Sequence, residues 1–193
     1  MRRKVAAVSL IFIVPWVFSP MISDICKNHE PTDIRGCIST LIDYRLASSL
    51  SNTADAYYSG VNGQAPNYRK AMELHKKAAA YNWADSAYSE FYIAKMYVDG
   101  DGVTRDLKQA IEWYTKAAER GKAGSQYNIG SLYHREKSIQ NLTLAHMWYS
   151  IASKNKIPDK YAAKSRDEVA AMLTESQLEE SEQLVAKWFA EHP

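Results

Sequence analysis

The sequence predicts an all-α protein built as a solenoid of helix–turn–helix hairpins. Apolar residues in the central block 89–121 follow helical spacing in two halves, which a turn at Gly100 to Gly102 separates. The second half has an N-cap at Asp106 with Gln109 three residues later, a capping-box pattern, and it ends at a glycine. A single hairpin cannot bury its apolar face, so this fold requires neighbouring hairpins that stack.

The hairpin pattern recurs on both sides of the central block. Each copy has a candidate N-cap and, four positions later, an alanine; the pairs are Asn67 and Ala71, Asp106 and Ala110, and Asn141 and Ala145. The two later copies also share an aromatic pair, which is Trp113 and Tyr114 in one and Trp148 and Tyr149 in the other. Small residues let helix backbones approach, and large rings fill the space between them. We therefore expect three repeats, at about 53–86, 87–122 and 123–157.

This pattern resembles the Sel-one-like repeat family, whose members are relatives of the tetratricopeptide repeat. The resemblance covers 53–193, and over 89–121 it rests on Tyr97, Gly100, Gly102, Val103, Asp106, Ala110, Trp113, Tyr114, Ala117, Ala118 and Gly121. The third copy lacks the Gly-x-Gly turn, and the spacing of the first copy departs from the pattern by one residue in its turn and three after it. The resemblance implies a right-handed α-solenoid of about three repeats with a C-terminal capping helix.

The two ends of the predicted solenoid are expected to be capping segments. Residues 158–193 contain a capping box at Thr174 and Gln177, followed by an apolar stripe with charged residues behind it; the stripe consists of Leu178, Leu184, Val185, Trp188 and Phe189. A solenoid needs a polar-backed terminal helix of this kind for solubility. Residues 24–52 are expected to form a disulfide loop and then a short helix near 38–51.

The first 23 residues have the composition of an export signal. Three basic residues follow Met1, the stretch 5–18 is almost wholly apolar, and no charged residue occurs before Asp24. We interpret 1–23 as a signal peptide cleaved after Ser23, which makes the protein periplasmic. The alternative is an uncleaved anchor in the inner membrane, because the uncharged run is close to spanning length. Membrane contact is expected only through these residues.

The two cysteines, Cys26 and Cys37, follow the predicted signal closely. In an oxidising compartment they are expected to pair and close a short loop. A redox-active pair is the less favoured interpretation, because the Cys-x-x-Cys spacing is absent.

The net charge argues against a nucleic-acid partner. The whole chain has 24 Lys and Arg against 22 Asp and Glu. Without the three basic residues of the predicted signal, 24 − 3 gives 21 against 22, a net charge of −1. A nucleic-acid-binding domain is usually far more basic. We therefore expect shape and aromatic contacts, more than bulk charge, to select a partner.

No catalytic or metal-binding motif is found in the sequence. The five histidines form no pair with metal-ligand spacing, and there is no phosphate-binding loop or nucleophile elbow. The segment 99–102 superficially suggests a calcium loop, but Val103 and Ala110 occupy positions that need oxygen ligands. His75 takes the place of Tyr114 in its repeat and is expected to be a packing or helix-surface residue. We expect no enzymatic activity, no cofactor and no metal.

The first helices of the repeats are expected to line an extended concave binding face. The resemblance to the tetratricopeptide arrangement implies which positions lie in phase with Ala54, Ala94 and Gly130. The predicted partner-binding residues are Asp55, Tyr58, Tyr88, Lys95, Asp99, Ser131, His134 and Arg135. Such a mixture suits protein recognition, although the same residues could equally be ordinary surface positions.

These expectations favour a non-catalytic protein-interaction module of the bacterial envelope, acting as an adaptor, regulator or inhibitor. The resemblance implies one specific form, an immunity protein that blocks a cognate secreted effector such as a type VI secretion lipase. The alternative is a cell-wall-related enzyme or a protein that binds β-lactams or peptidoglycan. Relatives proposed for that role have a cysteine pair in each repeat, which this chain lacks.

Overall fold

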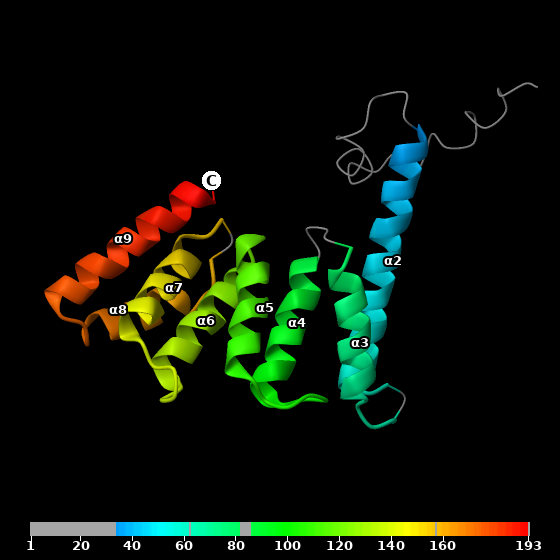
Figure 1. Ribbon diagram of the computed structural model, residues 1–193, viewed down its shortest axis with the longest axis horizontal. Helices are drawn as coiled ribbons and strands as arrows, with labels where there is room; N and C mark the ends of the chain where they lie inside the picture. Colours follow the sequence, from blue (N-terminus) through cyan, green and yellow to red (C-terminus); the bar gives the residue numbers. More distant parts are fainter. Residues whose placement is uncertain (1–33, 62, 82–85, 157, 193) are drawn as a thin grey trace, which may run out of the picture. The chain divides into compact units, whose positions relative to one another are not determined.

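The computed structural model describes residues 34–61, 63–81, 86–156 and 158–192 (Figure 1). In these ranges the chain is all-α, and its helices are α2 (Ile34–Ser59), α3 (Tyr68–Ala79), α4 (Ser86–Asp99), α5 (Leu107–Glu119), α6 (Ala123–Arg135), α7 (Leu142–Lys154), α8 (Ala162–Ala170) and α9 (Glu175–Glu191). The predicted fold class is confirmed. The predicted signal or anchor and Cys26 lie outside the described residues, as does the side chain of Cys37.

The chain divides into two compact units, 1–46 and 47–193. The described part of the first unit is the beginning of α2, and every contact discussed below lies in the second unit. No helix in the described ranges is both long and apolar enough to cross a membrane.

Helix α2 is one continuous helix, whereas the sequence predicts a short helix near 38–51 followed by a separate first repeat. No glycine or proline occurs from residue 37 to residue 59, so nothing in the sequence interrupts the helix at residue 52. The helix ends before Gly60, which has a φ of 72° and adopts the left-handed conformation that glycine tolerates.

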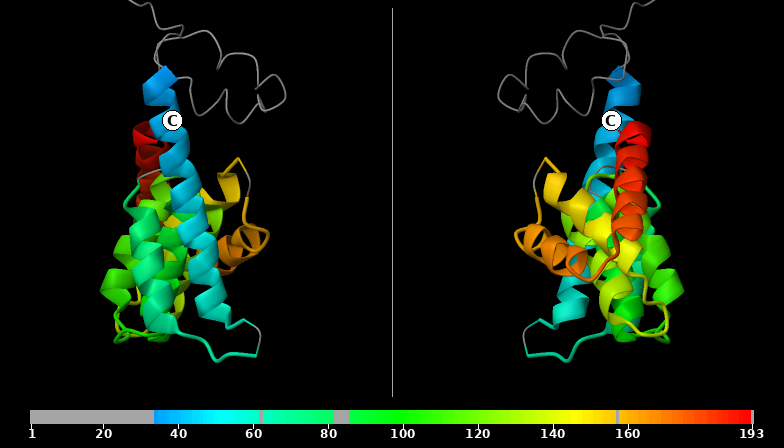
Figure 2. Two further views of the ribbon diagram at one scale, coloured as in Figure 1. Left: turned by 90° about the vertical axis from the view of Figure 1, so that its right-hand side faces the viewer. Right: turned by 90° about the vertical axis from the view of Figure 1, so that its left-hand side faces the viewer.

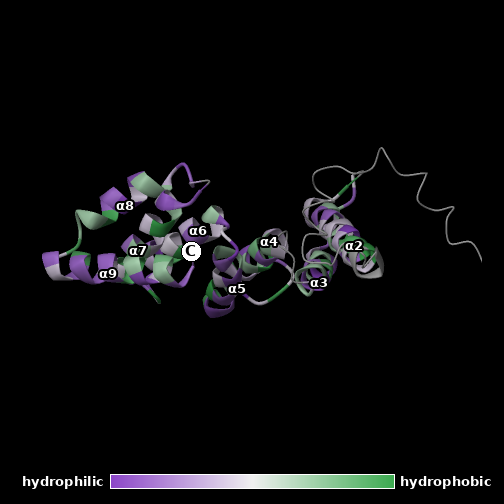
Figure 3. Cartoon of the chain, turned by 90° about the horizontal axis from the view of Figure 1, so that it is seen from above, coloured by the Kyte–Doolittle hydropathy of each residue, from purple (hydrophilic) through white to green (hydrophobic). Residues whose placement is uncertain are grey.

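The helices of the second unit pack in chain order. From α3 to α7 each helix contacts the next one along the chain. Helix α7 also contacts both α8 and α9, which lie on opposite sides of it (Figures 2 and 3). The hairpins α4–α5 and α6–α7 therefore stack as the repeat pattern predicts, and α8 and α9 cover the end of the stack.

All three predicted N-caps are formed. The side chains of Asn67, Asp106 and Asn141 accept hydrogen bonds from backbone N–H groups in the first turns of α3, α5 and α7. The capping box predicted at Asp106 is incomplete, because the backbone N–H of Asp106 donates to the carbonyl of Tyr97 at 3.0 Å and not to the side chain of Gln109. The box predicted at Thr174, at the start of α9, is complete.

One backbone hydrogen bond closes the turn of every repeat. The N–H of the cap residue donates to the carbonyl of a tyrosine two residues before the end of the preceding helix; the pairs are Asn67 with Tyr57 at 2.7 Å, Asp106 with Tyr97 at 3.0 Å and Asn141 with Tyr133 at 2.9 Å. The paired residues are separated by ten, nine and eight positions in the three repeats. The turns thus differ in length, but in each hairpin the same backbone bond joins the end of the first helix to the start of the second.

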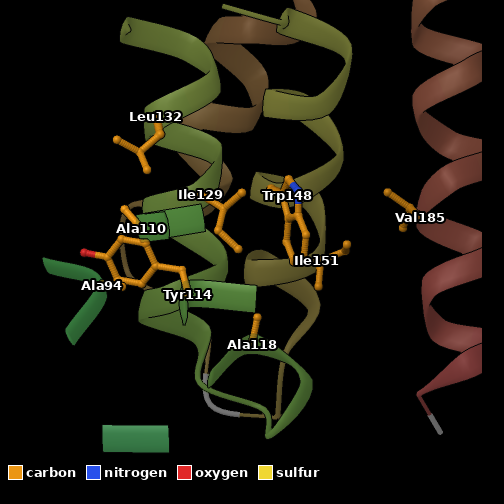
Figure 4. Close-up of a cluster of buried hydrophobic side chains, with 9 residues drawn as sticks. All are labelled: Ala94, Ala110, Tyr114, Ala118, Ile129, Leu132, Trp148, Ile151 and Val185. Carbon is orange, nitrogen blue, oxygen red and sulfur yellow. The ribbon is translucent and has the colours of Figure 1, made fainter. Parts of the chain in front are cut away.

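The core is made of small residues opposite large ones. Its main cluster draws side chains from α4, α5, α6, α7 and α9, and comprises Ala94, Ala110, Tyr114, Ala118, Ile129, Leu132, Trp148, Ile151 and Val185 (Figure 4). At Gly130 an added Cβ would lie 2.8 Å from Cδ1 of Tyr149. Glycine is needed there because the ring of the next helix occupies the place of its side chain.

Each repeat contributes one ring that bridges two first helices. The ring of Tyr114 on α5 packs against Phe91 of α4, and its hydroxyl accepts a hydrogen bond from Asn128 of α6 at 3.1 Å. Tyr149 on α7 packs against Tyr127 of α6 and belongs to a cluster with Val169 of α8. At the matching place in the first repeat the bridging residue is His75. These rings connect each repeat to the one that follows.

Helix α9 covers the end of the stack with most, but not all, of its predicted apolar stripe. Val185 is buried, and the ring of Trp188 meets Trp148 edge-on with 4.9 Å between centroids. Ser181, which is buried, lies 2.8 Å from Nδ1 of His146 on α7. Phe189 remains 37% exposed, so its inclusion in the stripe was wrong.

The turn between α4 and α5 provides a test of this packing. Gly102 has a φ of 72°, and a Cβ added to it would lie 2.7 Å from the backbone carbonyl carbon of Tyr68. We expect Gly102→Ala to lower the free energy of unfolding by about 3 kcal/mol, because it combines a left-handed alanine with a backbone clash. The measurement is urea unfolding followed by circular dichroism.

Gly121→Ala is the matched control. Gly121 also has a positive φ, of 82°, but an added Cβ would meet no atom within 4 Å. Only the cost of the backbone conformation applies, about 1 kcal/mol. Equal losses in the two variants would contradict a close approach between this turn and α3.

Candidate functional site

The predicted binding residues from α2 and α4 are already bonded to one another. The hydroxyl of Tyr88 on α4 donates to Oδ2 of Asp55 on α2 at 2.8 Å. Burial raises the pKa of Asp55, and the hydrogen bond from Tyr88 opposes part of that rise. The Asp55 side chain is nevertheless 32% exposed, so its carboxylate is both held in place and reachable from solvent.

His75 lies directly behind this pair. Its side chain is fully buried, with Nε2 3.5 Å from Oδ1 of Asp55 and Nδ1 3.3 Å from Oγ of Ser89. The imidazole also stacks on Tyr92, with 5.3 Å between ring centroids. Burial lowers the pKa of His75 from its ordinary value of 6.5 to about 4, so the ring is neutral at neutral pH. We name Asp55, His75 and Tyr88 the Asp55 group.

Ser89, His75 and Asp55 are the residue types of a hydrolytic triad, but their geometry is different. In a triad the base accepts the proton of an accessible serine hydroxyl. Here Ser89 is 1% exposed and its hydroxyl donates to Ser51 at 3.1 Å. A substrate carbonyl could not reach this oxygen. The arrangement is a buried hydrogen-bonded link between α2, α3 and α4.

A second set of predicted residues surrounds Lys95 on α4. Its ammonium donates to the hydroxyl of Tyr58 at 2.7 Å and to Oδ2 of Asp99 at 2.6 Å. The Tyr58 hydroxyl in turn donates to Asp101 at 3.1 Å. Burial disfavours the charge on Lys95, but the hydrogen bonds to Asp99 and Tyr58 outweigh it and raise its pKa. We name Tyr58, Lys95, Asp99 and Asp101 the Lys95 group.

Tyr92 joins these two groups. Its ring contacts Tyr88 at 4.8 Å and Tyr58 at 5.6 Å between centroids, in addition to stacking on His75. Aromatic contacts of this kind stabilise their arrangement beyond simple burial. The polar face of α2 and α4 is therefore built on a rigid cluster of tyrosines.

The three predicted residues on α6 lie elsewhere. The ring of His134 meets Tyr149 edge-on at 6.2 Å. Burial raises the pKa of Tyr149, and the hydroxyl of Ser131 and the positive charge of Arg135 oppose part of that rise. Arg135 is exposed, and Ser131 and His134 are half-buried. Within the described ranges, no hydrogen bond or ion pair joins these residues to the Lys95 group. The eight predicted residues thus form two bonded sets and one separate set.

Three participants were not predicted as binding residues. Tyr92 lies on the same face of α4 as Tyr88, Lys95 and Asp99, so helical spacing alone could have identified it. Asp101 belongs to the turn after α4, and its contact with Tyr58 depends on how the first two repeats stack. For His75 the predicted packing position is correct, but its polar partners could not be read from the repeat pattern.

The turn residues once compared with a calcium loop serve other partners. Asp99 pairs with Lys95, and Asp101 accepts from Tyr58. Among the described residues, no group of three or more His, Cys, Asp or Glu side chains is placed to hold a metal ion.

A separate hollow of about 750 Å³ lies between α3, α4 and α5. Its lining includes Trp113, Lys116 and the ion pair of Arg120 with Glu90, whose Nε and Oε2 are 3.0 Å apart. The Lys116 ammonium lies 3.9 Å from the Trp113 ring centroid. These charges already have partners within the hollow.

Comparison with known families identifies the repeats. A family model described as Sel1 repeat matches residues 44–80, 87–122 and 123–156, which together exceed half of the chain. The second and third matches contain the hairpins α4–α5 and α6–α7, and the first contains α3 with the later part of α2. No curated protein matches the sequence significantly.

Two solved structures share the fold. One is a protective antigen present in uropathogenic Escherichia coli strains, with an SLR fold, a TM-score of 0.54 and 19% identity. That match covers 90% of this chain and 45% of the antigen, so the chain spans less than half of the antigen's length. The other is a Sel1 repeat protein from Oxalobacter formigenes, with a TM-score of 0.51 and 24% identity, covering 63% of this chain and 88% of that one.

The neutral state of His75 predicts a dependence of stability on pH. Its pKa is lower in the folded than in the unfolded chain, so the unfolded state binds the proton first as the pH falls. The stability that the neutral His75 contributes is fully present above pH 6.5 and is lost as the pH falls towards 4. Over this fall in pH, we expect the titration of His75 to lower the free energy of unfolding by up to about 3 kcal/mol. Urea unfolding at a series of pH values measures it.

His75→Tyr is the variant to compare, because Tyr114 and Tyr149 occupy the same place in the other repeats. This variant retains Asp55 and also His146, another buried histidine, whose pKa is lowered by burial. The difference between the two proteins therefore isolates His75. Identical pH profiles would contradict a neutral, buried imidazole.

Proposed function

The chain belongs to the Sel1 repeat family, and from this premise we propose that it is a non-catalytic module that binds another protein. Sel1 repeats generally mediate protein–protein interactions. The observation that supports this function is the ordered polar and aromatic face of α2 and α4, in which Tyr58, Tyr88 and Lys95 are held by hydrogen bonds while remaining partly exposed.

Preorganisation makes this face suitable for recognition. Ordering a long side chain on binding costs roughly 0.5–1.5 kcal/mol. Lys95 is already held by Tyr58 and Asp99, and Tyr88 is held by Asp55. Part of the ordering cost is therefore already met in the free protein, before a partner binds. Tyrosines such as Tyr58 and Tyr88 are among the residue types that contribute most to interface affinity.

The proposed setting is the bacterial envelope, with the export signal at 1–23 delivering the protein to the periplasm. The specific form of the proposal is an immunity protein that binds a cognate secreted effector, such as a type VI secretion lipase, and covers its active site. Finding a gene for a secreted hydrolase next to this one would support this form. Deletion of the present gene is then expected to cause self-intoxication, and normal growth of the deletion strain beside a functional effector contradicts it.

The binding face is tested with the double variant Tyr88→Ala and Lys95→Ala. A stoichiometric partner is isolated from periplasmic extract with the tagged full chain, identified by mass spectrometry and purified, and its affinity is measured by calorimetry. We expect the variant to bind at least about tenfold more weakly, because two ordered contact residues are lost.

The matched control is the double variant Lys108→Ala and Glu112→Ala, which removes two exposed charged side chains from α5. It is expected to bind as the wild type does. Unchanged affinity in the Tyr88 and Lys95 variant would exclude this face. Turnover of a cell-wall substrate by the purified protein, without any protein partner, would overturn the proposed function itself.

A further inference from the structure

A second cavity, of about 380 Å³, lies beside the Asp55 group. It is enclosed by the later part of α2, by α3 and by the start of α4, and its lining includes Ser48, Ser51, Asn52, Asp55, Ala78 and Tyr88. The volume falls within the range of roughly 300–1,000 Å³ that is typical of pockets for small groups. Its walls are partly apolar, and the side chains of Ser48, Ser51, Asn52 and Asp55 add oxygens that can accept hydrogen bonds.

The cavity has a negative charge that no cation among its described lining residues balances. Among the described residues that line it, Asp55 alone carries a full charge at neutral pH. In the described part of the chain, the ionisable neighbours of its carboxylate are the neutral His75 and the hydroxyl of Tyr88. The Lys122 ammonium lies over the Tyr88 ring, 5.5 Å from its centroid, and makes no ion pair with Asp55 in the described part of the chain.

The hydrogen bonds behind Asp55 leave its carboxylate incompletely satisfied. Oδ1 of Asp55 and Nε2 of His75 face each other at 3.5 Å, and neither has a hydrogen-bond partner among the described residues. Tyr88 donates to the other oxygen, Oδ2, so Oδ1 remains able to accept hydrogen bonds from a donor on another molecule. A partly buried carboxylate oxygen without such a donor lacks the partner that stabilises its charge.

From this geometry we propose that the cavity receives one arginine side chain of the bound protein. The guanidinium would donate to the carboxylate of Asp55 and to the oxygens of Ser51 or Asn52, beside the ring of Tyr88. This inference rests on the proposed function, which supplies the partner, and names the chemistry that the partner presents.

Arginine fits this cavity better than lysine for two physical reasons. Its planar group has five donors in a fixed fork, which match several acceptors spread around one wall, whereas an ammonium is a single point of charge. It is also less strongly hydrated, so it enters a partly buried site at lower cost. An acidic side chain is excluded, because it would place a second negative charge against Asp55.

The test uses N-acetyl-arginine methylamide as a probe and its citrulline analogue as a neutral match of nearly the same shape. The purified, isotope-labelled full chain is titrated with each compound to about 50 mM and followed by nuclear magnetic resonance. We expect saturable shifts of the amides of Ser51, Asp55 and Ser89 with the arginine probe. The citrulline analogue is expected to bind at least about tenfold more weakly, since it cannot form charge-assisted hydrogen bonds.

Asp55→Asn removes the charge and keeps an oxygen that can accept from Tyr88. We expect it to weaken arginine binding at least about tenfold. Asp167→Asn is the control, because Asp167 is an exposed carboxylate on α8 that is already paired with Arg166, and it is expected to leave the titration unchanged. Absence of saturable shifts, equal binding of the citrulline analogue, or equal losses in both variants would overturn the inference.

The same variants separate this inference from the proposed function. A protein partner that binds wild type and Asp55→Asn equally well leaves the function standing and overturns the arginine site. A partner that loses affinity with Asp55→Asn, and that also loses it when one of its own arginines is replaced, supports both. Binding of the probe by a chain that has no protein partner would overturn the proposed occupant and the proposed function together.

Discussion

One ring in each repeat, placed between two successive first helices, is the contact on which the stack depends. Tyr114 connects α4 to α6, and Tyr149 packs on α6 and reaches the Val169 cluster of α8. The ring can reach both neighbours only if the opposing backbone is close, and Gly130 shows how close, since a single added carbon would overlap Tyr149. The backbone bond that closes each turn keeps this ring in register although the turns differ in length.

The chemistry of the candidate site follows from one departure within this scheme. In the first repeat the bridging ring is an imidazole, so the contact between successive repeats becomes polar. Burying His75 requires polar neighbours; Nδ1 lies within hydrogen-bond distance of Ser89, and Nε2 faces the carboxylate of Asp55 at 3.5 Å. Asp55 extends this buried network to the surface, where Tyr88 binds its other oxygen. The histidine at the core position that tyrosine holds in the other repeats is thus accompanied by an incompletely satisfied carboxylate, Asp55, at the wall of an open cavity.

Features that depend on nearby residues were predicted well. The caps at Asn67, Asp106 and Asn141 are recognisable because an N-cap acts within one turn of its own helix. The complete box at Thr174 follows the same rule. The return bond expected at Gln109 is not formed because the Asp106 N–H that would donate it closes the turn with the carbonyl of Tyr97 instead. The exposure of Phe189 was missed because the sequence of α9 alone does not show how many of its apolar residues α7 contacts.

The all-α class, the three repeats and the face of α4 on which Tyr88, Lys95 and Asp99 lie could be predicted from the sequence, because helical period and capping are local properties. Which of these residues meet became known from the folded chain. The pairing of Tyr88 with Asp55, the contact of Tyr58 with Asp101 and the position of His75 behind the carboxylate all join segments more than ten residues apart. Such contacts depend on the distance and rotation between stacked repeats, which the packing of rings against small residues sets.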